Sequence, residues 1–135
     1  NRHGVRIGTA EIYRVLDAVP GVGDSMVVNL ELKDGASFVP LFIESAAGDI
    51  DGAAIDRINE RLRHECSPRH VPDVIVTVPE IPYTITGKKL EIPVKRILMG
   101  IDPDHAAYRA AMRTPHSLDF FVDYARRLPF AAGAR

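Results

Sequence analysis

The residues best suited to chemistry stand at positions 82–89, where the sequence reads PYTITGKK. This stretch puts a lysine, Lys88, directly behind a glycine in a polar turn that follows a proline-bounded lead-in. A lysine is a compact positive charge on a flexible stem, so at the tip of a turn it can reach into a neighbouring site. No other stretch has the look of a complete catalytic apparatus. We therefore expect Lys88 to be one half of a site whose other half lies on a different domain.

A phosphate-binding P-loop is the first alternative for a Gly-Lys pair. That loop needs a glycine five positions before the glycine of the pair and a Ser or Thr after the lysine. Pro82 and Lys89 occupy these positions, so the sequence argues against a P-loop. A solvated basic turn with no function remains open for a bare TGKK.

Composition limits the classes of function. The 135 residues, 46% of them apolar, suit one domain or one domain with an appendage. A net charge of −1 gives no basic field for nucleic acid, and no apolar run approaches the ~20 residues that span a bilayer. The single cysteine, Cys66, excludes an internal disulfide and suits a reducing compartment, so we expect a cytoplasmic protein. The opening NRHGVRIG lacks a signal-peptide core and begins abruptly, as a piece of a larger protein would.

The elements that must position the turn alternate along the chain. β-branched and apolar runs predict strands at 5–7, 26–32, 38–43 and 74–78, the middle two joined at Asp34-Gly35. Helical spacing predicts helices from Thr9, an expected N-cap, from Asp51, and through Met99 with Pro93 in the first turn. The order β-α-β-β-α-β predicts an α+β fold. We expect a small mixed or antiparallel sheet of about three strands plus a short N-terminal hairpin, backed by helices.

The composition shifts after Gly100. Asp102-Pro103 and Thr114-Pro115 have the form of helix openings, and a later helix places an apolar face at Leu118, Phe121, Val122 and Ala125. We therefore divide the chain into a domain at 1–100 and a helical C-terminal extension at 101–135 with a frayed end.

Two segments together carry a resemblance to a known superfamily. Pro82…Thr86-Gly87-Lys88 resembles the C-terminal motif of the adenylate-forming enzymes, which include acyl-CoA synthetases, non-ribosomal adenylation domains and luciferases. The opening GVRIGTAEI is similar to the segment after their inter-domain hinge, and the two motifs stand in the same order and spacing. The longer phrases RIGTAEIYRV, SPRHVPD, TGKKLEIPVKRIL and SLDFF resemble the acetoacetyl-CoA synthetase family.

The resemblance implies a fold and an activity. Residues 1–100 would be the mobile C-terminal lid of an AMP-forming acid–thiol ligase that converts acetoacetate and CoA to acetoacetyl-CoA through an acyl-adenylate. ATP with Mg²⁺ and CoA would be substrates of the full-length enzyme, and this segment alone would bind no cofactor and be inactive. Its partner would be the large N-terminal adenylation domain. Lids of acetate or propionate ligases, and a non-catalytic α+β interaction module, remain alternatives.

The resemblance also assigns roles to residues. Lys88 would be catalytic, offsetting the charge that grows on the α-phosphate as the carboxylate attacks. Arg6 would bind the nucleotide, or else be an exposed strand arginine. His3 and Gly4 would border the pantetheine of CoA. Arg63 would contact a CoA phosphate, or else belong to a polar helix face.

Other reactive residues have ordinary explanations. His64, His70, His105 and His116 are scattered without metal-ligand spacing, so we expect no metal site. Cys66 fits a core position better than a nucleophile, and Glu11 suits its helix. We expect no nucleic acid or membrane partner. An exposed lysine on a mobile loop is also a plausible target for a protein acetyltransferase and deacetylase, which would act on Lys88.

Overall fold

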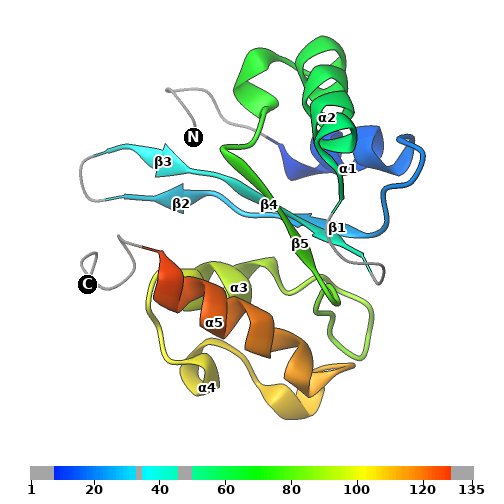
Figure 1. Ribbon diagram of the computed structural model, residues 1–135. Helices are drawn as coiled ribbons and strands as arrows, with labels where there is room; N and C mark the ends of the chain where they lie inside the picture. The colour runs from blue at the N-terminus through cyan, green and yellow to red at the C-terminus, as the bar shows by residue number, and fades with distance from the viewer. Residues whose placement is uncertain (1–7, 33–34, 46–49, 129–135) are drawn as a thin grey trace.

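The computed structural model describes residues 8–32, 35–45 and 50–128 (Figure 1). Its centre is a mixed three-stranded sheet in the order β1-β4-β5. Strand β1 (Ser25–Val27) runs antiparallel to β4 (Pro40–Glu44), and β4 runs parallel to β5 (Val74–Val78). Strands β2 (Leu30–Glu31) and β3 (Ser37–Phe38) form a separate antiparallel pair.

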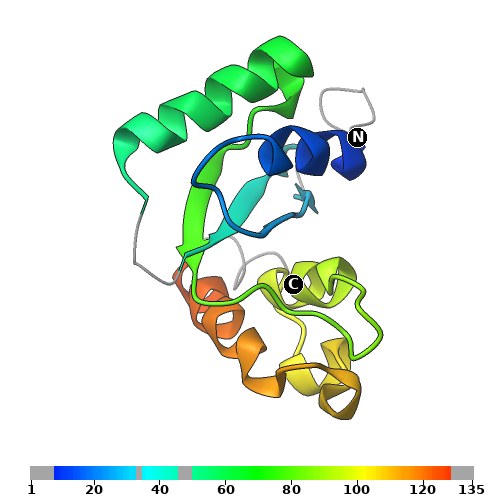
Figure 2. The ribbon, with the colours of Figure 1, turned by 90° about the vertical axis from the view of Figure 1, so that its right-hand side faces the viewer.

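Helices cover both faces of the central sheet (Figures 1 and 2). Helices α1 (Thr9–Asp17) and α2 (Gly52–Glu65) lie on one face. Helices α3 (Glu91–Leu98) and α5 (Asp119–Arg127) lie on the other, with the short α4 (Pro103–Ala106) beside α3. Three 3₁₀ turns complete the described structure: η1 (Pro68–His70), η2 (Arg109–Ala111) and η3 (Pro115–Leu118).

The central strand β4 explains why the domain needs two helical layers. Successive side chains of a strand point to opposite faces of the sheet. Leu41 and Ile43 therefore enter the core formed with α1 and α2, whereas Phe42 enters the core formed with α3 and α5. All three side chains have an exposed fraction of 0%. The ring of Phe42 meets the ring of Phe121 of α5 edge to face, with centroids 4.8 Å apart.

The predicted α+β fold class is confirmed, but two predicted strands are each interrupted. The run 26–32 divides into β1 and β2, and the run 38–43 divides into β3 and β4. The chain leaves the central sheet at these breaks and continues into the two-stranded pair, so one hydrophobic run serves two sheets.

Helix starts show where local signals were sufficient. The expected helix start at Asp51 is confirmed, because Asp51 is the N-cap of α2 and its carboxylate accepts a hydrogen bond from the Ala54 N–H at 2.7 Å. The expected cap at Thr9 is wrong: Gly8 caps α1 and no side chain accepts a capping bond. Helix α3 begins at Glu91, and Pro93 still lies within its first turn, where a missing N–H costs no intrahelical bond.

The C-terminal segment packs into the same core as α3. Leu118 and Phe121 are fully buried there, and Val122 and Ala125 pack against them, which confirms the predicted apolar face. The boundary near residue 100 remains a prediction. Among the described residues, no helix is both long and apolar enough to cross a bilayer.

Candidate functional site

Lys88 lies in a tight turn between β5 and α3, within a segment that we call the lysine loop (residues 82–89). The Thr84 N–H donates to the Lys88 carbonyl at 2.9 Å, and the Gly87 N–H donates to the Thr84 carbonyl at 3.0 Å. The Thr84 hydroxyl also accepts from the Lys88 N–H at 3.0 Å. Gly87 has a φ of 92°, a conformation that favours glycine strongly over residues with a Cβ. These contacts give the loop a defined shape.

The tip of the loop faces away from the protein. Lys88 and Thr86 are exposed, and Ile85 is 64% exposed although it is apolar. Within the described part of the chain, no acidic group lies within ion-pair distance of the Lys88 ammonium. The charge of Lys88 is therefore available to something outside this domain.

The next residue, Lys89, points the opposite way. Its side chain is only 19% exposed, and its ammonium lies 3.5 Å from the Asp24 carboxylate and 3.5 Å from the centre of the Tyr13 ring. The Tyr83 hydroxyl donates a hydrogen bond to the same Asp24 carboxylate. Asp24 precedes β1 and Tyr13 belongs to α1. Contacts with these two residues therefore hold both ends of the lysine loop next to α1 and the start of β1.

A second tyrosine links these elements to α3. The Tyr13 hydroxyl donates to the Glu91 carboxylate and accepts from the Val27 N–H at 3.0 Å. Burial raises the pKa of the Tyr13 hydroxyl well above its usual value, and the hydrogen bond to Glu91 adds to the rise. Burial, followed by the bond to Asp24, likewise raises the pKa of Tyr83. Both tyrosines therefore stay protonated as donors at neutral pH. We call these five side chains (Tyr13, Asp24, Tyr83, Lys89 and Glu91) the anchor cluster.

The other side of the loop rests on the segment around η2. The Ile85 N–H donates to the Ala111 carbonyl, and the Arg113 N–H donates to the Tyr83 carbonyl, both at 2.9 Å. The Arg113 guanidinium lies over the Tyr83 ring at 5.0 Å, and its Nη2 comes within 3.6 Å of the position of a Cβ on Gly87. Arg113 thus adds positive charge beside Lys88. The sequence offered no local signal for this contact, since Arg113 follows a helix in a segment treated as an extension.

The structure does not gather the other predicted site residues around Lys88. Arg63 lies on α2, on the face of the sheet opposite α3 (Figure 1), where it is exposed and bonds Glu60 at 2.7 Å. His3, Gly4 and Arg6 lie outside the described residues. The roles given to these four residues remain predictions.

The expectation of no metal site stays a prediction, but one of the histidines lies beside other side chains that can bind metals. His70 does not stand apart, because its Nε2 lies 3.2 Å from the Glu11 carboxylate, and Cys66 belongs to the same group of side chains. Cys66 packs partly buried against the core between α1 and α2. Burial raises the pKa of its thiol, the charge of Glu11 raises it further, and Arg14 partly opposes the shift. In the sequence, the spacing Cys-x₃-His between Cys66 and His70 was the one local indication that these two side chains lie close together.

No family model matches the chain. An acetoacetyl-CoA synthetase from Caenorhabditis elegans is 42% identical over 126 residues, which cover 92% of this chain. The solved structure of an acetoacetyl-CoA synthetase from Streptomyces lividans matches 93% of the chain with a TM-score of 0.84 and 37% identity. The chain belongs to the acetoacetyl-CoA synthetase family.

The chain corresponds to the C-terminal part of acetoacetyl-CoA synthetases and spans only 18% of the length of the Caenorhabditis elegans relative. A malonamoyl-CoA synthetase from Penicillium aethiopicum is also 41% identical over 106 residues, or 76% of this chain. The comparisons do not favour the alternatives of an acetate or propionate ligase or of a non-catalytic module. The α+β arrangement of the chain matches the C-terminal domain of acetoacetyl-CoA synthetase.

Proposed function

We propose that this chain is the mobile lid of an AMP-forming ligase that makes acetoacetyl-CoA from acetoacetate, MgATP and CoA. The observation that carries the proposal is a lysine with no acidic partner among the described residues. It stands on a firmly anchored turn, in a chain homologous to acetoacetyl-CoA synthetases. The rest of the active site would lie on the large domain that precedes this segment in the whole protein.

In the first half-reaction, a carboxylate oxygen of acetoacetate attacks the α-phosphorus of ATP. A new O–P bond forms, the bond to the β-phosphate oxygen breaks, and pyrophosphate leaves with the electron pair. Negative charge grows on the α-phosphate oxygens and on the leaving group. A positive charge held in place before the reaction stabilises such a transition state most effectively. We assign this role to the ammonium of Lys88, with Arg113 adding positive potential nearby.

The anchor cluster supports this assignment by separating two adjacent lysines. Lys89 is occupied by Asp24 and the Tyr13 ring, so it fixes the base of the lysine loop. Lys88 is left as the group that extends outward. Because the backbone of the loop is fixed, only the side-chain torsions of Lys88 must be ordered to position its ammonium.

In the second half-reaction, the CoA thiol gives up its proton to solvent and its sulfur attacks the acyl carbon. A C–S bond forms, and AMP leaves with the electron pair as the C–O bond to the phosphate breaks. We propose that the lid rotates between the two steps and withdraws Lys88. His3 and Gly4 would then border the pantetheine, Arg6 would contact the nucleotide, and Arg63 would meet a phosphate of CoA. Movements of this kind let one site serve two reactions.

The identity of the acyl substrate must be chosen between two similar acids, because one relative is named for an acid other than acetoacetate. The malonamoyl-CoA synthetase is nearly as similar to this chain as the acetoacetyl-CoA synthetases are. Malonamate differs from acetoacetate by an amide NH₂ in place of a methyl group, so the two acids have nearly the same shape. We propose acetoacetate because the relatives named for it cover more of the chain.

The test uses the longest protein that the gene encodes. We expect continuous turnover, with release of AMP and pyrophosphate over many cycles, only when ATP, CoA and a carboxylic acid are all present. Among acetoacetate, malonamate, acetate and propionate, kcat/KM should be highest for acetoacetate. Removing the segment from Gly8 onward should abolish turnover. If no carboxylate supports pyrophosphate release by the intact protein, the proposed function is wrong. If malonamate is the best substrate, the ligase assignment stands and the acyl assignment fails.

A further inference from the structure

Three side chains with different donor atoms meet where the end of α2 approaches α1. Glu11 lies in the first turn of α1, Cys66 caps α2, and His70 closes η1. One ligand atom from each lies within 4.8 Å of the others. Among the residues that the structure describes, this is the only group of three such side chains.

The spacing is close to that of a tetrahedral metal site. Zinc binds Cys sulfur at about 2.3 Å and His nitrogen or carboxylate oxygen at about 2.0–2.2 Å, which separates neighbouring ligand atoms by roughly 3.2–3.8 Å. The Glu11 oxygen and His70 Nε2 are already 3.2 Å apart. A sulfur at the 4.8 Å limit needs to approach the other two ligand atoms by up to about 1.3 Å, because its tetrahedral separation from nitrogen or oxygen is about 3.5 Å. The Glu11 side chain is 51% exposed, so its carboxylate has room to move on the solvent side.

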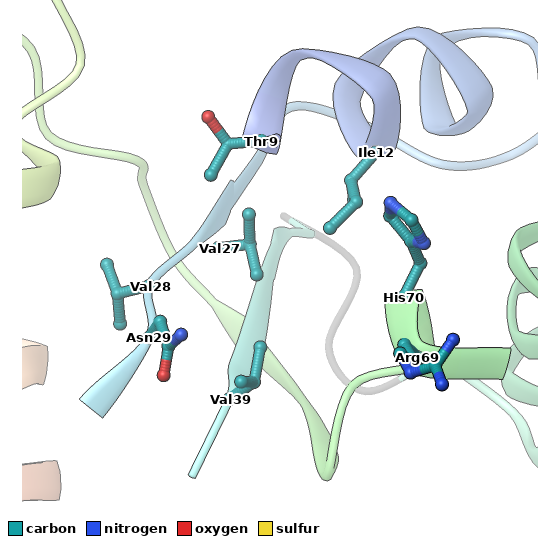
Figure 3. A pocket seen from close by; sticks show the side chains of 8 residues that line it. All are labelled: Thr9, Ile12, Val27, Val28, Asn29, Val39, Arg69 and His70. Carbon is teal, nitrogen blue, oxygen red and sulfur yellow. The ribbon is translucent and has the colours of Figure 1, made fainter. Parts of the chain in front are cut away.

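The orientation of His70 also suits a metal ligand. Its ring is only 12% exposed and its Nδ1 is hydrogen bonded to the Ser67 hydroxyl at 2.7 Å. Figure 3 shows the ring directed toward α1, beside the small pocket that it helps to line. Ligating histidines usually have their second nitrogen held by a neighbour in this way, which fixes the ring and the tautomer.

We propose that Glu11, Cys66 and His70 form a binding site for a divalent cation of the zinc class. A thiolate and a carboxylate neutralise the two charges of the ion, while the imidazole binds in its neutral form. On binding, the thiol releases its proton to solvent and the Sγ–metal bond replaces the S–H bond. A water molecule completes the four ligands. The mixed S, N, O donor set excludes Mg²⁺ and Ca²⁺, which select oxygen ligands.

A metal bound at this site would link α1, the end of α2 and η1. Without metal, the described contacts between these parts include apolar packing, the Glu11–His70 ion pair and a hydrogen bond from the Cys66 thiol to the Glu11 carbonyl at 4.0 Å. Bound metal would stabilise the folded chain in proportion to its concentration. This inference does not depend on the proposed ligase activity.

The test is a titration of the full 135-residue chain with Co²⁺ and with Zn²⁺. Cobalt reports a sulfur ligand through its thiolate charge-transfer absorption, and calorimetry gives the zinc stoichiometry. We expect one ion per chain, a thiolate band with cobalt, and a rise in melting temperature with added zinc. Cys66→Ser should remove the band, and His70→Gln should weaken zinc binding by about 100-fold or more. Ser67→Ala should weaken it by roughly 10-fold, as the loss of an orienting neighbour does.

A matched control is His64→Gln. His64 lies two residues before Cys66 and also pairs with a carboxylate, that of Glu60, but its side chain is 73% exposed and it does not belong to the group of Glu11, Cys66 and His70. This variant should bind zinc as the parent does. Circular dichroism establishes that each variant is folded. A folded parent chain that shows no thiolate band, or a band that survives in Cys66→Ser, would overturn the proposal, as would equal losses in the His64 and His70 variants.

Discussion

Replacing Lys89 with methionine should destabilise the fold, whereas the same change at Lys88 should not. Methionine keeps the apolar stem of lysine and removes only the ammonium. At Lys89 that ammonium lies 3.5 Å from the Asp24 carboxylate and 3.5 Å from the Tyr13 ring centre, in a side chain that is 19% exposed. At Lys88 it is exposed and has no acidic partner among the described residues.

The magnitude follows from the contacts that Lys89 would lose. A cation over an aromatic ring contributes about 0.5–2 kcal/mol, depending on its exposure. Exposed ion pairs contribute up to about 1 kcal/mol, and this pair is more sheltered than most. Asp24 would not be left unpaired, because the Ser25 N–H at 2.8 Å and the Tyr83 hydroxyl still donate to it. We therefore expect a loss of about 1–3 kcal/mol for Lys89→Met.

Urea unfolding of the two variants measures the difference. The free energy of unfolding of Lys88→Met should stay within about 0.5 kcal/mol of the parent, as is usual for surface changes away from structural contacts. Lys89→Met should lose about 1–3 kcal/mol with an unchanged dependence on urea. Equal effects of the two substitutions would refute the view that Lys89 holds the loop and Lys88 is free.

Three further predictions concern the same loop. Gly87→Ala should lower the free energy of unfolding by about 1–2 kcal/mol because φ is 92° there. Urea unfolding measures this loss. The control is Gly52→Ala, which should be neutral or stabilising because Gly52 is the first residue of α2 and a Cβ there meets open space. The pKa of Tyr83 is higher in the folded than in the unfolded protein, so the protonated hydroxyl adds its full contribution to the free energy of unfolding below the unfolded pKa of about 10. That contribution is lost as pH rises above this value. Melting from pH 8 to 11 should therefore fall less steeply in Tyr83→Phe, and an unchanged slope would contradict the assignment. Acetylation of Lys88 should abolish adenylation by the whole protein and deacetylation should restore it; peptide mass spectrometry that finds Lys88 unmodified in acetylation-inactivated enzyme would exclude this mechanism.

Local chemistry in the sequence predicted much of the fold and the candidate catalytic lysine. Asp51 caps its helix, the apolar face of α5 is buried, and the turn around Gly87 presents Lys88 to solvent. Each of these features depends on residues a few positions apart. Short-range rules for caps, turns and periodicity therefore reach them.

The supporting contacts could not be predicted because they join distant residues. Tyr83 and its partner Asp24 are 59 positions apart, and Tyr13 and Glu91 are 78 positions apart. The approach of Cys66 to Glu11 depends on how α1 packs against α2, which no local pattern encodes. Likewise, the breaks that divide two predicted strands depend on which sheet each half joins.

The central claim is that Lys88 serves adenylation and no other step. The decisive measurement compares the two half-reactions of the whole protein with and without the substitution Lys88→Ala. The control is Lys95→Ala, because Lys95 is a half-exposed lysine on the neighbouring helix α3 and its ammonium pairs with Glu31 of β2. We predict that Lys88→Ala slows acetoacetate-dependent ATP–pyrophosphate exchange by at least ~10²–10³, the scale for losing one preorganised charge-stabilising group. Thioester formation from preformed acetoacetyl-adenylate and CoA should remain near the parent rate, and Lys95→Ala should alter neither. Equal losses of both half-reactions in Lys88→Ala, or exchange at the parent rate, would contradict the account.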